Sequence, residues 1–302
     1  MTDAEFNPEC GRAEALGPGL RRILAPNPSP MTQRGTNTYL LGMRDIAVID
    51  PGPDHEAHLS AILDALEPGQ RITHIFVTHS HKDHSPLARP LSTATGAPIY
   101  AYGRSGAGRS AIMTRLSAAG LSDSGEGIDA DFLPDHCLSD EEVIAGPDWS
   151  LTALWTPGHL GNHLCFAWGD VVFTGDLVMG WASSLVSPPD GDLTDFMASC
   201  RRLRARGASV FHAGHGAPIT DPMGRLDWLI DHRLAREAAI LEALSHGPAT
   251  PRALTHGIYT ETPAALLPAA ERNILAHLID LYMKNEVTPM GKLTETARFQ
   301  KT

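Results

Sequence analysis

The chain has 302 residues, of which 42% are hydrophobic and 20% charged, a composition typical of a folded globular protein rather than a disordered one. Its 24 Lys and Arg stand against 35 Asp and Glu, and the net charge of −11 argues against a broad basic surface for duplex DNA or an anionic membrane. No apolar run approaches the roughly 18 residues of a membrane-spanning helix, and the acidic, polar opening MTDAEFNPEC lacks the pattern of an export signal.

Short apolar runs between turn residues dominate the first two-thirds of the chain. Clusters of β-branched and aromatic residues predict strands at 38–41, 46–49, 72–78, 151–155, 163–167, 171–173 and 209–211. Apolar residues at helical spacing predict helices at 58–66 and 193–206. We expect Ser85 and Pro86 to be the N-cap and first residue of a further helix, which Pro90 limits or kinks.

Helical periodicity takes over beyond about residue 223. The spacing predicts a long helix over 226–244, ended by Gly247 and Pro248, and shorter helices around 251–256 and 271–284. Residues 291–299 are predicted to form a short strand or hairpin. Because three helices and a hairpin are typical of a small winged-helix-like unit, we divide the chain into domains of residues 1–222 and 223–302.

The segment after the strand at 72–78 concentrates metal-binding side chains. Residues 79–84 (HSHKDH) hold three imidazoles and one carboxylate, the nitrogen and oxygen ligands that a borderline divalent metal prefers. A lone histidine is usually an ordinary core or surface residue, but H-x-H-x-D-H directly after a strand rarely arises by chance. The pattern therefore predicts a metal site.

Three later strands run into glycine-bearing turns of the same design. TPGH at 156–159 offers His159, TGD at 174–176 offers Asp176, and HAGHG at 212–216 offers His215. Glycine permits close backbone approach and unusual φ angles, and loops at strand ends are the usual place for functional side chains.

Taken together, H-x-H-x-D-H, T-P-G-H, G-D and G-H-G, in this order over residues about 35–220, resemble the metallo-β-lactamase superfamily. The resemblance implies an α/β fold, an αββα sandwich with helices outside two packed sheets, followed here by the small winged-helix-like domain. It also implies a dinuclear site at one edge of the sandwich. One metal would be held by His79, His81 and His159, the other by Asp83, His84 and His215, and Asp176 would bridge the two.

Such a site predicts a metal-dependent hydrolase that uses a metal-bridging hydroxide, because coordination lowers the pKa of water toward about 7. Asp83 is expected to help orient the water, and Asp50 to orient a ligand histidine from outside the site. Two divalent ions are the implied cofactors. Zinc is favoured over manganese and iron, since His81 stands where redox flavo-diiron relatives carry Glu.

Two substrate classes compete. The motifs at 35–39 (GTNTY), 188–192 (PPDGD) and 232–237 (HRLARE) resemble the lactamase-like endoribonuclease branch, which carries a C-terminal winged-helix extension, and they favour phosphodiester hydrolysis in single-stranded RNA. The ligand set equally permits glyoxalase-II-like thioester or ester hydrolysis. Charge argues weakly against RNA, because residues 223–302 carry nine basic and nine acidic side chains.

A non-enzymatic, metal-containing DNA-binding regulator is the least favoured reading, because the C-terminal unit lacks clustered positive charge. We expect this unit to cover one side of the cleft or to form a homodimer contact. Four cysteines without a C-x-x-C pair fit reduced thiols, which favours a cytoplasmic protein. Among the other histidines, we expect His163 to pack or to donate a hydrogen bond near the site, and His55 and His58 to be solvated.

Overall fold

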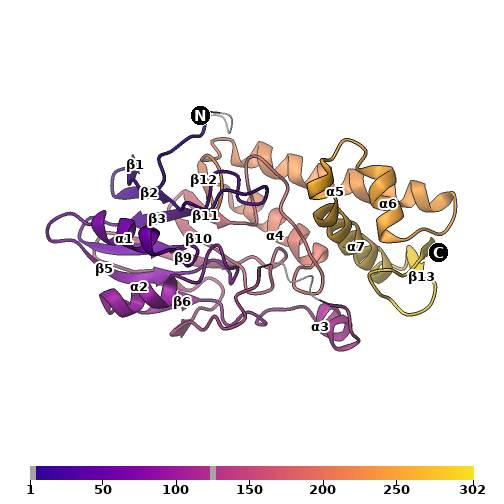
Figure 1. The fold of residues 1–302 in the computed structure, drawn as a ribbon, viewed down its shortest axis with the longest axis horizontal. Coiled ribbons are helices and arrows are strands. Elements are labelled where there is room, and N and C mark those ends of the chain that lie inside the picture. The colour runs from indigo at the N-terminus through magenta and orange to yellow at the C-terminus, as the bar shows by residue number, and fades with distance from the viewer. Residues whose placement is uncertain (1–4, 123–126) are drawn as a thin grey trace.

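The computed structural model describes residues 5–122 and 127–302, so the first four residues of the acidic opening lie outside the described part. Strands form the centre of the larger part, helices flank them, and the C-terminal helices make a second part at the other end of the molecule (Figure 1). Three apolar clusters separate successive layers of helix, sheet, sheet and helix. This arrangement confirms the predicted αββα sandwich and the helical unit that follows it.

The first sheet has seven strands in the order β1-β2-β3-β4-β5-β6-β7. Neighbours run antiparallel from β1 to β4 and parallel from β4 to β7. The strands are β1 (Glu14–Gly17), β2 (Leu20–Leu24), β3 (Asn37–Leu41), β4 (Asp45–Ile49), β5 (Arg71–Phe76), β6 (Ile99–Ala101) and β7 (His136–Cys137).

The second sheet has five strands in the order β12-β11-β10-β9-β8. Strands β11 and β12 pair in parallel and the others antiparallel. Their bounds are β8 (Val143–Ala145), β9 (Ser150–Trp155), β10 (Leu164–Trp168), β11 (Val171–Gly175) and β12 (Val210–Ala213).

Alternation of side chains along the strands explains the layers, because successive residues of a strand point to opposite faces. In β4, Ile46 and Val48 join the cluster beneath helices α1 (Glu56–Asp64) and α2 (Ala88–Thr95), whereas Ala47 and Ile49 pack against the second sheet. Helices α4 (Leu193–Arg206) and α5 (Pro222–Ser245) cover the outer face of the second sheet.

The C-terminal helices surround a core of their own. Helix α3 (Ala111–Ala118), the second half of α5, α6 (Pro251–Ile258), the 3-10 turn η1 (Ala264–Leu266), α7 (Leu267–Met283) and the hairpin of β13 (Val287–Pro289) with β14 (Phe299–Lys301) make up this region. Helix α5 belongs to both parts, because Leu226 and Leu229 pack in the sandwich while Ile240 and Leu244 pack in the C-terminal core. The division at residues 222 and 223 stays a prediction. None of the described helices is long and apolar enough to cross a bilayer.

Each predicted strand and helix is present within a few residues of its expected bounds, but the cap at Ser85 is wrong. Helix α2 starts at Ala88 with Leu87 as its N-cap. The Ser85 hydroxyl instead lies 2.7 Å from Asp129 Oδ2 and 3.1 Å from the carbonyl oxygen of His81. It therefore braces the loop that carries H-x-H-x-D-H.

His58 is not solvated as expected. Its side chain is 1% exposed, and its Nε2 lies 2.8 Å from the Thr38 hydroxyl. Burial lowers the pKa of His58 to about 4, so the ring is neutral at pH 7. The predicted terminal hairpin exists, but its paired residues flank the segment 291–298 instead of lying within it.

Candidate metal centre

The loop after β5 carries the first four candidate ligands. β5 ends at Phe76, and the buried chain beyond it turns so that His79 and His84 are completely buried while Asp83 is partly exposed. A network of backbone hydrogen bonds holds the turn, including those from the His84 and Ser85 amides to the His81 carbonyl. The loop is therefore a fixed scaffold.

The other candidates come from loops at the ends of the second sheet. His159 follows β9, Asp176 follows β11 directly, and His215 follows β12. A Cβ atom at Gly214 would lie 2.5 Å from Asp176 Oδ1 and 2.6 Å from His84 Cε1, so this approach of the chain requires glycine.

The fold brings all seven predicted ligands together in two groups. Within each group, one potential ligand atom of every residue lies within 4.8 Å of those of the others. The first group is His79, His81 and His159, and the second is Asp83, His84, Asp176 and His215. In the first group, His81 Nδ1 lies 2.9 Å from His79 Nε2 and 3.0 Å from His159 Nε2.

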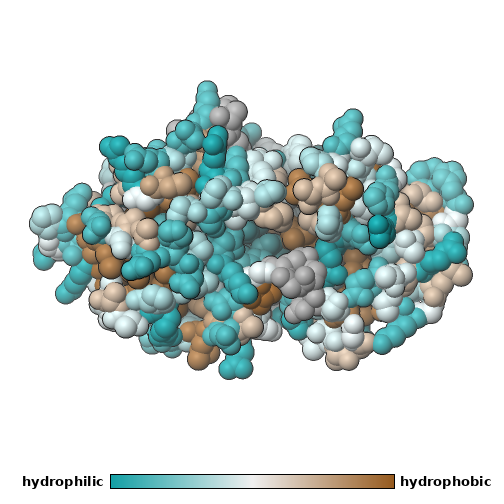
Figure 2. All heavy atoms as spheres, in the orientation of Figure 1, coloured by the Kyte–Doolittle hydropathy of each residue, from teal (hydrophilic) through white to brown (hydrophobic). Residues whose placement is uncertain are grey.

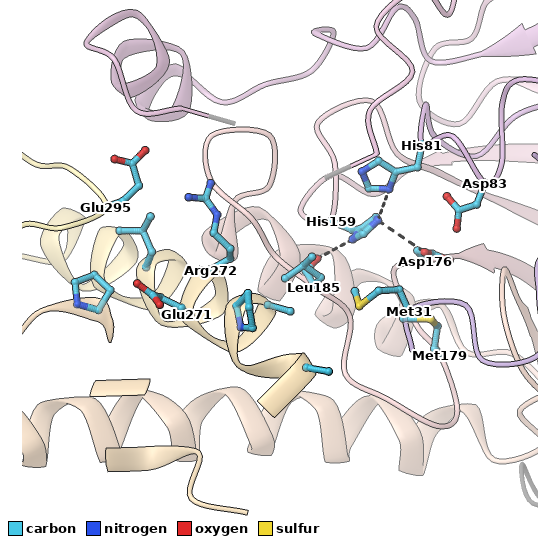
Figure 3. Close-up of a pocket in the computed structure, with 15 residues that line it drawn as sticks. Met31, His81, Asp83, His159, Asp176, Met179, Leu185, Glu271, Arg272 and Glu295 are labelled. Carbon is cyan, nitrogen blue, oxygen red and sulfur yellow. Dashed lines mark hydrogen bonds and ion pairs between the residues drawn. The ribbon is translucent and has the colours of Figure 1, made fainter. Parts of the chain in front are cut away.

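Asp176 reaches both groups. Its Oδ1 lies 3.5 Å from His84 Nε2 and its Oδ2 lies 3.4 Å from His215 Nε2, both in the second group. The same Oδ2 lies 3.9 Å from His159 Nε2 of the first group (Figure 3). One carboxylate thus stands between two sets of ligand atoms, the position that a bridging ligand requires.

Hydrogen bonds orient the histidine rings from outside the site. His84 Nδ1 donates to Asp50 Oδ2 at 2.9 Å, and His215 Nδ1 donates to the Gly35 carbonyl at 3.1 Å. His159 Nδ1 donates to the Leu185 carbonyl at 2.7 Å. Since Nδ1 is the donor in each case, Nε2 is the ring nitrogen that faces the site and is left to bind a cation.

Asp50 serves both groups. Its carboxylate accepts the Thr78 amide at 2.7 Å, the Thr78 hydroxyl at 2.8 Å and the His84 ring. Because the Thr78 hydroxyl donates to Asp50, it accepts from His79 Nδ1, 3.0 Å away. The φ angle of Asp50 is 51°, a left-handed conformation that aspartate tolerates better than most residues. This buried carboxylate therefore orients His84 directly and His79 through Thr78.

The two groups differ in their protonation. Burial lowers the pKa of His79 well below its ordinary value and that of His81 to about 3, so both rings are neutral. Burial opposes protonation of His84 and His215 too, but there the carboxylates of Asp83 and Asp176 prevail. They raise the pKa of His84 well above its ordinary value and that of His215 to about 10.

The same attraction, against the effect of burial, lowers the pKa of both Asp83 and Asp176. Two protons on imidazoles thus balance two carboxylates in the second group. In addition, His84 Nε2, His215 Nε2 and Asp176 Oδ1 are buried atoms without a hydrogen-bond partner of adequate geometry among the described residues. Buried polar atoms are normally satisfied, so this arrangement fits a divalent cation that replaces the protons.

His163 lies outside the two ligand groups, and three residues not predicted from the sequence orient the ligands. His163 packs 5.2 Å from the His79 ring, with its Nδ1 3.1 Å from the Thr156 hydroxyl. The orienting roles of Thr78 and Gly35 do not follow from the sequence pattern, although Thr78 ends the strand predicted at 72–78 and Gly35 opens the GTNTY motif. Leu185 left no sequence signal, because it acts through a backbone carbonyl that any residue supplies.

A cavity of about 540 Å³ opens beside both groups. His81, Asp83, His159 and Asp176 line one end of it, and Glu271, Arg272 and Glu295 line the other (Figure 3). The other residues that line the cavity are all apolar: Met31, Met179, Leu185, Pro251, Ala265, Pro268, Ala269 and Leu275. The hollow between the sandwich and the C-terminal helices is visible in Figure 2. The C-terminal unit therefore covers one side of the site.

Two family models match the chain. The model described as Metallo-beta-lactamase superfamily matches residues 31–215, and the model described as Beta-lactamase associated winged helix domain matches residues 250–289. These matches agree with the resemblance drawn from the motifs. They do not separate the endoribonuclease branch from the others, and that branch stays a prediction.

Similar proteins span nearly the whole chain. Beta-lactamase-like protein 2 homolog of Caenorhabditis elegans is 28% identical, over 86% of this chain and 83% of its own. Atrochrysone carboxyl ACP thioesterase of Aspergillus fumigatus is also 28% identical, over 92% of this chain and 84% of its own. A beta-lactamase domain protein from Burkholderia ambifaria has the same fold, with a TM-score of 0.81 at 21% identity, covering 99% of this chain and 96% of that one.

Proposed function

The chain belongs to the metallo-beta-lactamase superfamily, and from this membership we propose that it hydrolyses an acyl thioester or ester with two divalent metal ions. His79, His81 and His159 would hold one ion, Asp83, His84 and His215 the other, and Asp176 would bridge them. The main support for an acyl substrate is the mostly apolar cavity beside these ligands.

The donor set supports zinc. Three neutral imidazoles make up the first group, and the second adds carboxylates to imidazoles, ligands that zinc accepts well. Bound dications would lower the pKa of water toward about 7 and polarise the ester carbonyl.

A side chain of the protein would orient the attacking water. Asp83 lines the cavity, and its Oδ2 lies 3.2 Å from His215 Nε2. A carboxylate in this position can accept a hydrogen bond from water and aim its lone pair at an acyl carbon. We therefore assign Asp83 the orienting role.

The cavity wall favours an acyl group over an RNA strand. Leu185 stands between His159 and helix α7, and Met31 and Met179 lie beside Asp176 (Figure 3). Such a surface gains free energy by burying an apolar acyl chain. At the far end the carboxylates of Glu271 and Glu295 outnumber the guanidinium of Arg272, so the net charge there would repel a phosphodiester backbone. The thioesterase name of the Aspergillus fumigatus relative also supports the acyl class.

Parallel assays test this proposal. Metal-loaded protein is expected to cleave thioesters with long or aromatic acyl groups faster than short ones, and to leave single-stranded RNA intact. Chelation should abolish activity and zinc should restore it. A His256→Ala variant, which removes an exposed histidine of α6, serves as a control and should keep full activity. Cleavage of RNA with no thioester turnover would select the phosphodiesterase reading instead.

The protonation of the second group predicts proton release on metal binding. At pH 7, His84 and His215 are protonated in the metal-free protein because their pKa values are raised, so each must lose its proton before it can bind a cation. Metal affinity should therefore increase as the pH rises from 7 toward 10. Calorimetry in buffers of different ionisation enthalpy measures the released protons. A titration that releases none contradicts the assignment.

Linkage gives the matching expectation for stability. The raised pKa of His215, about 10 against 6.5 for an ordinary histidine, stabilises the metal-free fold fully below pH 6.5. This contribution is lost as the pH rises through 10. Thermal unfolding of metal-free protein should accordingly show a falling melting temperature over this window.

A further inference from the structure

The loop between β11 and α4, residues 177–191, connects the metal ligands to the C-terminal helices. Arg225 of α5 donates from Nε to the Met179 carbonyl and from Nη2 to the Ala182 carbonyl, both at 2.7 Å. Arg233, about two helical turns further along α5, donates to the Ser184 carbonyl. The C-terminal unit thus holds this loop through its backbone, independently of the loop's side chains.

One peptide group of this loop forms hydrogen bonds through both its carbonyl and its amide. Its carbonyl, that of Leu185, accepts the hydrogen bond from His159 Nδ1 at 2.7 Å (Figure 3). Its amide, that of Val186, donates to Asn273 Oδ1 of α7 at 3.0 Å. Since the peptide group is planar and rigid, the Asn273 oxygen sets the direction in which the Leu185 carbonyl points.

Asn273 is itself held by a buried cation. Arg233 is 1% exposed, and its Nη1 donates to the same Asn273 Oδ1 at 3.0 Å. Its guanidinium also lies 5.1 Å from the centre of the Phe196 ring. A charged donor strengthens a hydrogen bond in a buried setting, so Arg233 fixes the amide of Asn273 and, through it, the peptide group.

We infer that Asn273, supported by Arg233, is a positioning residue that orients His159 through the peptide group between Leu185 and Val186. The inference rests on the proposed function, in which His159 binds a metal. It makes the C-terminal helices part of the metal centre as well as a cover for the cavity. It also assigns a role to the first arginine of the HRLARE motif.

The effect should be confined to one metal. His79, His84 and His215 take their orientation from Thr78, Asp50 and Gly35, which all belong to the sandwich. His159 alone among these rings depends on the loop that α5 and α7 hold. Losing the Asn273 oxygen should therefore weaken the first group and leave the second unchanged.

Two substitutions of Asn273 separate orientation from packing. Asn273→Leu keeps a similar volume but removes the acceptor, whereas Asn273→Asp keeps an acceptor for Val186 and Arg233. Titration of Co²⁺ into the full-length, metal-free protein, followed by visible absorption, resolves the binding steps. The step that His159→Ala removes identifies the first group, and the melting temperature of each metal-free variant reports on folding.

We expect Asn273→Leu to weaken the first step by about 10- to 100-fold, with the second step unchanged and Asn273→Asp close to wild type. The inference is overturned if the leucine variant binds both ions normally, if both steps weaken together, or if the aspartate variant is as weak as the leucine variant. Wild-type protein that fails to bind two ions would instead refute the proposed function itself.

Discussion

Replacing Asp176 by alanine is expected to lower the hydrolytic rate by about 10³-fold and to empty at least one of the two metal positions. Asp176 lies within 3.9 Å of ring nitrogens from both groups, so its carboxylate faces both proposed metal positions. Without it, the two proposed dications would lose the carboxylate that offsets their mutual repulsion. Steady-state rates on the best thioester, together with elemental analysis, measure the loss.

Asp280→Ala is the matched control for this experiment. Asp280 is as buried as Asp176, at 7% exposure, and it pairs with the Lys284 ammonium and the Thr194 hydroxyl. Its removal should lower the melting temperature but leave both metals and the turnover rate in place. If the Asp176 variant kept two metals and wild-type turnover, the bridging assignment would have to be abandoned.

Asp50→Asn is expected to lower turnover by about 10²-fold, because it favours the tautomer of His84 that cannot bind a metal. The wild-type carboxylate accepts the Thr78 amide at Oδ1, and the Thr78 hydroxyl and His84 Nδ1 at Oδ2. An asparagine must direct its NH₂ group at one of these partners. When it faces His84, the ring has to accept at Nδ1 and carry its proton on Nε2, the atom that should bind the cation.

Histidine NMR of zinc-loaded protein, in which His84 carries one ring proton, reports its tautomer directly, while metal affinity and turnover report the consequence. Asp45→Asn, at the other end of β4, removes a carboxylate that pairs only with the exposed Arg71 among the ion pairs described, and it should behave as wild type. An Asp50→Asn variant with normal metal affinity and the normal tautomer would show that Asp50 does not orient the ligands.

The sequence by itself determined the strands, the ligand candidates and the fold family. Local chemistry carries these features: β-branched runs such as 72–78 form strands almost wherever they pack, and H-x-H-x-D-H places its ligands within one short loop. The three remaining ligands follow strands, and the parallel pair β11 and β12 delivers Asp176 and His215 to the same sheet edge. The sequence also marked Asp50, because it ends a strand.

Only the tertiary structure decided what surrounds the ligands. The burial of His58, the dual reach of Asp50, the apolar cavity and the path from Arg233 to His159 all depend on contacts between segments far apart in the chain. Leu185 illustrates the physical reason. Its backbone carbonyl orients a ligand histidine, and because every residue type carries the same carbonyl, no pattern of side chains along the chain can reveal that role.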